Sequence, residues 1–121
     1  MNKATLSFWS DAALNSLFSR LGVSPSSFAL RGIDRTPPRV FPRSNGFHFV
    51  YEFEDANIEA AVNIVKRSDI RSLIESVLFE FPDVSPELTV GFESKMSETV
   101  LHLATNSITY LSEVGLSIDI V

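Results

Sequence analysis

Arginines recur at every fourth position in one segment and are the first residues here that could bind a ligand. The series is Arg31, Arg35, Arg39 and Arg43. On a helix they would share one face, but Pro37 and Pro38 lie between them and exclude a continuous helix. One interpretation is an anion or carboxylate clamp on a loop. The other is a solvated loop whose arginines pair with nearby carboxylates.

A second charged group follows an aromatic-rich segment and consists of Glu52, Glu54, Asp55 and Glu59. Carboxylates two residues apart on a strand are about 7 Å apart, which is within the range of catalytic acid–base pairs. Glycosidase pairs, however, lie in deep clefts of larger proteins. An acidic strand face open to solvent is better suited to docking a basic protein, and its ordinary alternative is a solvated sheet face.

Three further side chains have some functional potential. Trp9 falls on the outer face of the first predicted strand, where it would anchor a partner or be covered by a loop or helix. His48 and His102 are both expected on the polar sheet face, but no third ligand has a recognisable metal-site spacing. The chain has no cysteine, which excludes disulfides and thiolate sites. We therefore predict no catalytic residue, no metal and no cofactor.

Hydrophobic periodicity indicates which elements carry these residues. Alternation predicts strands at 4–9, 47–54, 88–92, 99–103 and 116–121, with a short one near 27–31. In the 47–54 strand, Phe47, Phe49, Tyr51 and Phe53 form the expected buried face. Helical spacing predicts a helix over 14–21 that ends at Gly22, two helices that meet near Ser68, and a last helix that ends at Gly115. In that last helix Ile108, Leu111 and Val114 are the expected buried stripe, with Thr105 or Asn106 as the cap.

These elements predict an α+β fold. Strands and helices do not alternate strictly, and each clear strand has one more polar face. We expect a single domain over 1–121, with a mainly antiparallel sheet of about five strands and helices packed on one face. The strands at 88–92 and 99–103 would form a hairpin. Residues 23–46, rich in proline and glycine, would form a long loop.

Composition narrows the class of partner. Residues 1–43 contain six basic and two acidic side chains, whereas residues 44–121 contain four and thirteen, and together they give the net charge of −5. An acidic chain does not favour nucleic acid, whose binding depends on neutralising phosphates. No apolar run approaches the ~20 residues of a membrane span, and the first residues lack the apolar core of a leader peptide, so we expect neither. The sequence predicts a soluble cytoplasmic protein.

Two segments carry a family resemblance. Residues 21–32, LGVSPSSFALRG, and residues 111–120, LSEVGLSIDI, resemble the first and last conserved blocks of the bacterial domain of unknown function 4279 family. The chain departs from the family pattern where Phe47 or Phe49 stands in place of a tryptophan. The resemblance implies an α+β fold, small bacterial intracellular proteins and no established catalytic residues. It also implies a suspected role as an immunity partner of secreted toxins.

Two functional hypotheses follow. The first is an immunity protein, not an enzyme, that neutralises a cognate toxin of a contact-dependent or polymorphic system, with a basic nuclease domain as the expected toxin. Its predicted contacts are Trp9, Glu52, Glu54, Asp55 and Glu59. The alternative is an anion-binding module, or an enzyme of unknown class, that uses the arginine-rich 31–43 loop. A self-associating domain is a third hypothesis, and the sequence leaves the oligomeric state open.

Overall fold

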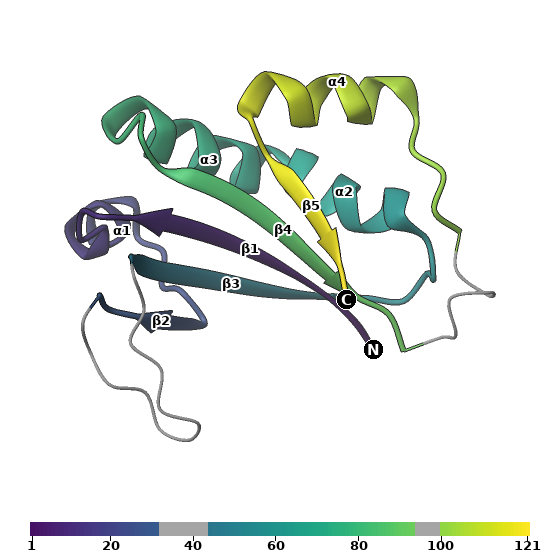
Figure 1. Ribbon diagram of the computed structural model, residues 1–121, viewed down its shortest axis with the longest axis horizontal. Helices are drawn as coiled ribbons and strands as arrows, with labels where there is room; N and C mark the ends of the chain where they lie inside the picture. Colours follow the sequence, from purple (N-terminus) through teal and green to yellow (C-terminus); the bar gives the residue numbers. More distant parts are fainter. Residues whose placement is uncertain (32–43, 94–99) are drawn as a thin grey trace.

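The protein is described by a computed structural model over residues 1–31, 44–93 and 100–121. Within these described ranges, five strands form one sheet in the order β2-β3-β1-β4-β5, and four helices accompany it (Figure 1). The strands are β1 (Asn2–Ser10), β2 (Ser27–Ala29), β3 (Asn45–Phe53), β4 (Ser85–Gly91) and β5 (Ser117–Ile120). The helices are α1 (Asn15–Leu21), α2 (Ile58–Lys66), α3 (Ser68–Glu80) and α4 (Thr105–Val114).

The sheet is mixed but mostly antiparallel. β1 lies at its centre and pairs antiparallel with β3 on one side and β4 on the other. β2 pairs antiparallel with β3, whereas β5 runs parallel to β4. The predicted α+β class is confirmed, and β5 is the strand that makes the sheet mixed.

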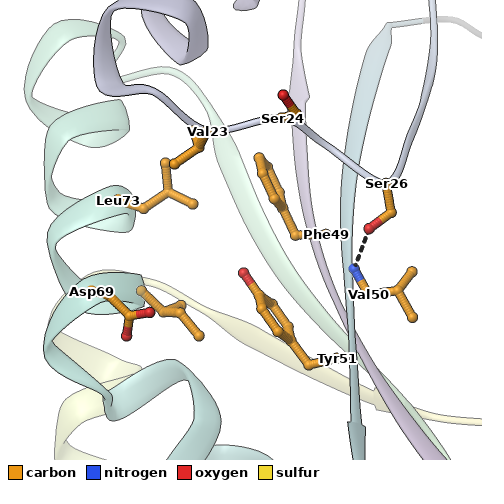
Figure 2. A pocket seen from close by; sticks show the side chains of 9 residues that line it. Val23, Ser24, Ser26, Phe49, Val50, Tyr51, Asp69 and Leu73 are labelled. Atoms are coloured by element: carbon orange, nitrogen blue, oxygen red, sulfur yellow. Dashed lines mark hydrogen bonds between the residues drawn. The ribbon is translucent and has the colours of Figure 1, made fainter.

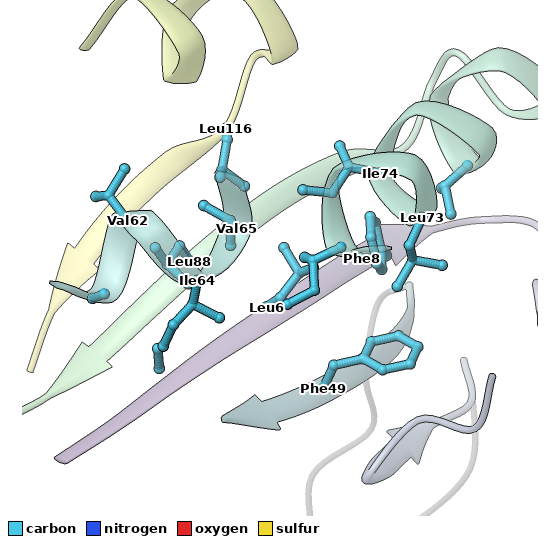
Figure 3. Close-up of a cluster of buried hydrophobic side chains, with 14 of the residues drawn as sticks. Leu6, Phe8, Phe49, Val62, Ile64, Val65, Leu73, Ile74, Leu88 and Leu116 are labelled. Atoms are coloured by element: carbon cyan, nitrogen blue, oxygen red, sulfur yellow. The ribbon is translucent and has the colours of Figure 1, made fainter. Parts of the chain in front are cut away.

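One face of the sheet is covered by helices, and the core lies between them. Alternate residues of β1, among them Ala4, Leu6 and Phe8, are fully buried on that face. Figure 3 shows Leu6 and Phe8 on the same side of the sheet as Val65 of α2 and Ile74 of α3. Burial of side chains of this size stabilises the fold by ~1.5–3 kcal/mol each. The predicted inward face of the first strand is therefore confirmed.

Phenylalanines join α1 to this core. The Phe18 ring packs edge-on against Phe47 and Phe49, with ring centroids 5.3 Å apart in both pairs. Phe8 completes the cluster, 6.0 Å from Phe49. Gly22 ends α1 with a φ of +69°, in the left-handed region that favours glycine. The predicted stop at Gly22 is confirmed.

The predicted break near Ser68 is also confirmed, because α2 ends and α3 begins around Arg67. That residue is extended, with φ −61° and ψ 144°, so the helix cannot continue through it. At the other end of the chain, Gly115 ends α4 with a φ of +66°.

Two predictions in the last third of the chain are wrong. Residues 100–103 form no strand: Val100 makes a single parallel bridge to Asn57, and Leu101 is 47% exposed. Thr99 and the expected hairpin connection at 94–98 lie outside the described residues. Ile108 is 53% exposed, and Tyr110 takes the expected buried place by donating its hydroxyl to the Val65 carbonyl at 3.1 Å. Both predictions rested on short repeats of aliphatic residues. Such repeats fit a strand or a helix locally, but packing in the whole fold decides which side chains are buried.

Within the described ranges, no helix is long and apolar enough to cross a membrane.

Candidate functional site

The face of the sheet opposite the helices carries a hydrogen-bonded cluster of polar side chains and one indole. Trp9 of β1 donates its Nε1–H to Glu87 Oε2 of β4 at 3.1 Å. Thr89 Oγ1 lies 3.4 Å from the other oxygen of Glu87. On the β3 side of the indole, Ser7 Oγ of β1 and His48 Nδ1 of β3 lie at a hydrogen-bonding distance of 2.8 Å. We call this face the open face and these residues the Trp9 cluster.

The backbone beneath the indole contributes to its position. Trp9 lies directly opposite Gly46 in the β1–β3 ladder. A Cβ at Gly46 would lie 2.6 Å from Trp9 Cζ3, so the absence of a side chain lets the ring lie over the strand. The His48 ring meets the indole edge-on with centroids 5.2 Å apart. Trp9 is thus held by Glu87, Gly46 and His48 while part of its ring remains accessible.

The pairing of Ser7 with His48 has a limited chemical range. A serine next to a histidine is one element of a nucleophilic site. Ser7, however, is only 4% exposed and lies in the middle of the central strand, where a substrate carbonyl has little access to Oγ. The geometry favours a positioning role, in which Ser7 orients His48 beside the indole.

Three of the predicted acidic contacts, Glu52, Glu54 and Asp55, lie at or just beyond the far end of β3. Glu52 is opposite Lys3, whereas Trp9 is opposite Gly46, six residues further along the ladder. That separation is about 20 Å. Glu54 and Asp55 follow the end of β3 and are exposed. The structure therefore does not bring Trp9 and the acidic residues into one cluster.

Other carboxylates share the open face and were missed by the sequence reasoning. Asp119 of β5 pairs with Thr89, on the same side as Glu87. The alternation of β4 and β5 marks both as outward, but only the strand order places them beside β1. The sequence pattern therefore indicates that Glu87 and Asp119 point outward, but it does not indicate which residues lie next to them.

Glu59 has a structural role in the start of α4. Its Oε2 accepts the Ala104 N–H at 3.0 Å, and its Oε1 accepts the buried Ser107 hydroxyl. Lys66 donates to the same hydroxyl at 3.2 Å. The Ser107 hydrogen bond is the largest of the effects that hold the pKa of Glu59 below its usual value, and it outweighs partial burial. Glu59 thus takes the place expected of Thr105 or Asn106, because α4 has no side-chain cap of its own.

Of the four arginines, only Arg31 lies in the described part of the chain. Its guanidinium Nη1 is 3.4 Å from Asp11 Oδ1, and both side chains are exposed. Its backbone N–H donates to Asn45 Oδ1 at 2.7 Å. Arg35, Arg39 and Arg43 fall outside the described residues, so the anion clamp stays a prediction.

The two histidines are not on one face as expected. His48 is on the open face, whereas His102 precedes α4 and is one of the charges that lower the pKa of Glu59. Among the described residues, no group of three or more His, Cys, Asp or Glu side chains could hold a metal ion.

A groove of about 300 Å³ lies at the outer edge of β3, on the helix side (Figure 2). Its apolar lining comes from Phe49 and Tyr51 of β3 and from Ile70 and Leu73 of α3. The Asp69 carboxylate adds a charge at its rim. Burial, and then Asp69, raises the pKa of the Tyr51 hydroxyl, which therefore remains a hydrogen-bond donor at neutral pH. The sequence reasoning assigned Tyr51 and Phe49 to the core and missed this groove.

Comparison with known proteins gives no match: no family model, no curated protein and no solved structure is significantly similar to this chain. The resemblance to the domain of unknown function 4279 family therefore stays a prediction.

Proposed function

We propose that this protein is an immunity protein, which binds a cognate toxin domain and neutralises it by covering its active surface. The toxin belongs to a contact-dependent or polymorphic system, and neutralisation takes place in the cytoplasm. Neutralisation of this kind occurs by stoichiometric binding. It therefore requires a binding surface whose side chains are already ordered, and it requires no catalytic residue. The open face is the surface that best meets this requirement.

The observation that carries the proposal is the fixed indole of Trp9 on a sheet face that the helices leave uncovered. Tryptophan is enriched among residues that dominate binding energy, because it buries a large area with few rotatable bonds. Glu87 and Gly46 already hold its position, so little side-chain entropy remains to be lost when a partner binds. A partner would find the anchor in place.

The charge of the open face favours a basic partner. The open face carries three acidic residues, Glu52, Glu87 and Asp119, and one basic residue, Lys3. This acidic surface continues past the end of β3 with Glu54 and Asp55. A nuclease presents a basic surface to nucleic acid, and a carboxylate-bearing face can compete for that surface. We therefore propose a basic nuclease domain as the toxin. Trp9, Glu52, Glu54 and Asp55 are the contacts, and Glu59 supports α4.

The test begins with the gene next to this reading frame. A secreted-protein gene that ends in a compact basic domain supplies the candidate toxin, and co-expression should rescue cells from that domain. Replacing Glu52, Glu54 and Asp55 together with lysine should weaken binding and flatten its salt dependence, because long-range attraction is screened by salt. A matched control reverses Glu75, Asp83 and Glu113, which are exposed residues outside the open face.

The two variants carry the same net charge, so only the position of the reversed groups differs. Isothermal titration at low and high salt should show a loss for the first triple variant and near-wild-type affinity for the second. Trp9→Ala should weaken binding at both salt concentrations, because its contribution is apolar burial. Equal affinities for the two triple variants would contradict the acidic surface. Failure of co-expression to rescue cells would contradict the immunity role.

A further inference from the structure

The outer edge of β3 is only partly occupied by its neighbour. β3 has nine residues, but β2 pairs with three of them, and the last of these pairs is Ser27 with His48. In the described part of the chain, β3 has no strand on its outer side from Val50 to Phe53. The Val50 N–H instead donates a hydrogen bond to Ser26 Oγ at 3.0 Å. A side-chain hydroxyl thus stands where a strand would.

The direction of the Val50 N–H fixes the direction of the groups that follow. In an antiparallel ladder, successive residues turn their N–H and C=O groups alternately toward the two sides of the strand. Val50 turns its N–H away from β1, so Glu52 does the same. The Glu52 backbone donor and acceptor therefore point at the outer edge, where β2 has ended. An exposed edge of this kind is a template for another extended chain.

An apolar groove adjoins the same edge. Figure 2 shows Phe49 and Tyr51 on one side of it and Leu73 on the other, with Ser26 bonded to Val50 nearby. The groove is on the helix side of the sheet, because Phe49 and Tyr51 lie opposite Leu6 and Ala4 of the core face. A strand added at β3 would direct every second side chain into this groove and the others toward the open face.

The charges around the edge favour a basic occupant. Glu52 lies on the open-face side, and Glu54 and Asp55 follow at the end of β3. On the groove side, Asp69 is exposed and is paired with Arg67 at 3.3 Å. The open-face side of the edge is therefore acidic, whereas the groove side is apolar with a compensated charge.

We propose that the outer edge of β3 and the adjoining groove bind an extended peptide segment, which adds to the sheet as a further strand. Its apolar side chains fill the groove, and its alternate residues are lysine or arginine facing Glu52 and Glu54. Main-chain hydrogen bonds supply affinity, and alternate pockets supply specificity, as in other cases of strand addition. The inference does not depend on the partner being a toxin.

The probe is a capped six-residue peptide, acetyl-Lys-Val-Lys-Leu-Lys-Thr-amide, whose charge keeps it soluble. Titration into the isotopically labelled protein should shift the amide signals of Val50 and Glu52 and the side-chain signals of Leu73. Two isomers carry backbone N-methyl groups, one on its lysines and one on the other residues. Only the residues whose N–H groups face β3 need their hydrogen, so one isomer should lose binding and the other keep it.

The protein variants are a matched pair at Glu52. Glu52→Pro removes the backbone donor at an edge position, where proline is tolerated. Glu52→Gln removes the charge alone. We expect binding about tenfold weaker for Glu52→Pro and a smaller loss for Glu52→Gln that disappears at high salt. Thermal unfolding verifies that both are folded.

If Glu52→Pro does not fold, Ser24→Trp replaces it, because Ser24 is exposed and lines the groove. A bulky side chain there should block the peptide without removing a core residue. Equal binding of both N-methyl isomers, or wild-type affinity for the blocking variant, would overturn the proposal. So would the absence of any shift at Val50 and Glu52 at millimolar peptide.

Discussion

The two faces of the sheet use opposite means to fix their side chains. On the helix side, Leu6 and Phe8 are fully buried and held by apolar packing against several elements. On the open face, Trp9 donates a hydrogen bond to Glu87, packs closely over the backbone of Gly46 and meets the His48 ring edge-on. Both sets of residues alternate along the same strand β1.

A single strand can thus contribute to stability through one face and to recognition through the other. The helix face gains its stability from removing apolar area from water. The open face keeps its indole accessible, so its order must come from directional contacts that leave part of the ring uncovered. A change on the first face should therefore act on the free energy of unfolding, and one on the second should act mainly on the local order of Trp9.

The largest effect is expected at Phe8. Phe8→Ala removes a fully buried ring that contacts Phe18 and Phe49, and should cost ~3–5 kcal/mol in the free energy of unfolding. Phe79→Ala is the matched control, because Phe79 is 90% exposed and its loss should change stability by less than ~0.5 kcal/mol. Urea unfolding followed by circular dichroism measures both. Similar losses at the two positions would contradict the assignment of the core face.

A smaller effect is expected at Gly46. Gly46→Ala places a Cβ against the Trp9 ring and should cost ~1–3 kcal/mol through overpacking. Because Trp9 is the single tryptophan, its fluorescence emission should also shift to the red as the ring is displaced toward water. Gly91→Ala is the control, since the nearest atom to its Cβ would be 3.8 Å away. An unchanged emission spectrum for Gly46→Ala would refute the close approach of indole and backbone.

The smallest effect is expected at Glu59, which belongs to neither face. Glu59→Gln should destabilise the fold by about 1 kcal/mol or less at pH 7, because its carboxylate is partly solvated. The fold lowers the pKa of Glu59, so its stabilisation is present above the unfolded-state pKa and is lost as the pH falls through the folded-state pKa. The urea midpoints of wild type and variant should therefore differ at pH 7 and converge as the pH is lowered. A constant difference would show that ionisation of Glu59 is not involved.

Much of the fold could be predicted, because local patterns report burial. The alternation of Phe47, Phe49, Tyr51 and Phe53 correctly identified β3, and Gly22 and Gly115 correctly ended two helices. The failures occurred where the pattern was short. Leu101 and Leu103 are too few to specify a strand, and in α4 a tyrosine with a buried hydrogen bond replaced the expected Ile108.

The candidate site was less predictable than the fold. Trp9 and Glu52 were correctly placed on the outer face, but their separation along the sheet follows from the β1–β3 register, which no local pattern contains. The groove at β3 was missed because Tyr51 looks like a core residue. Whether Tyr51 is covered depends on where β2 stops pairing with β3.

Periods of two and of 3.6 residues are local properties of strands and helices, so in the longer elements the sequence alone shows which side chains face the core. Which outward-facing residues contact one another is set by the assembled fold. Trp9 reaches Glu87 across 78 positions of sequence, and Glu59 reaches Ser107 across 48. Such contacts depend on strand order and helix packing, which arise from the whole chain minimising its exposed apolar area. A local pattern can therefore orient a side chain, but only the assembled fold gives it a neighbour.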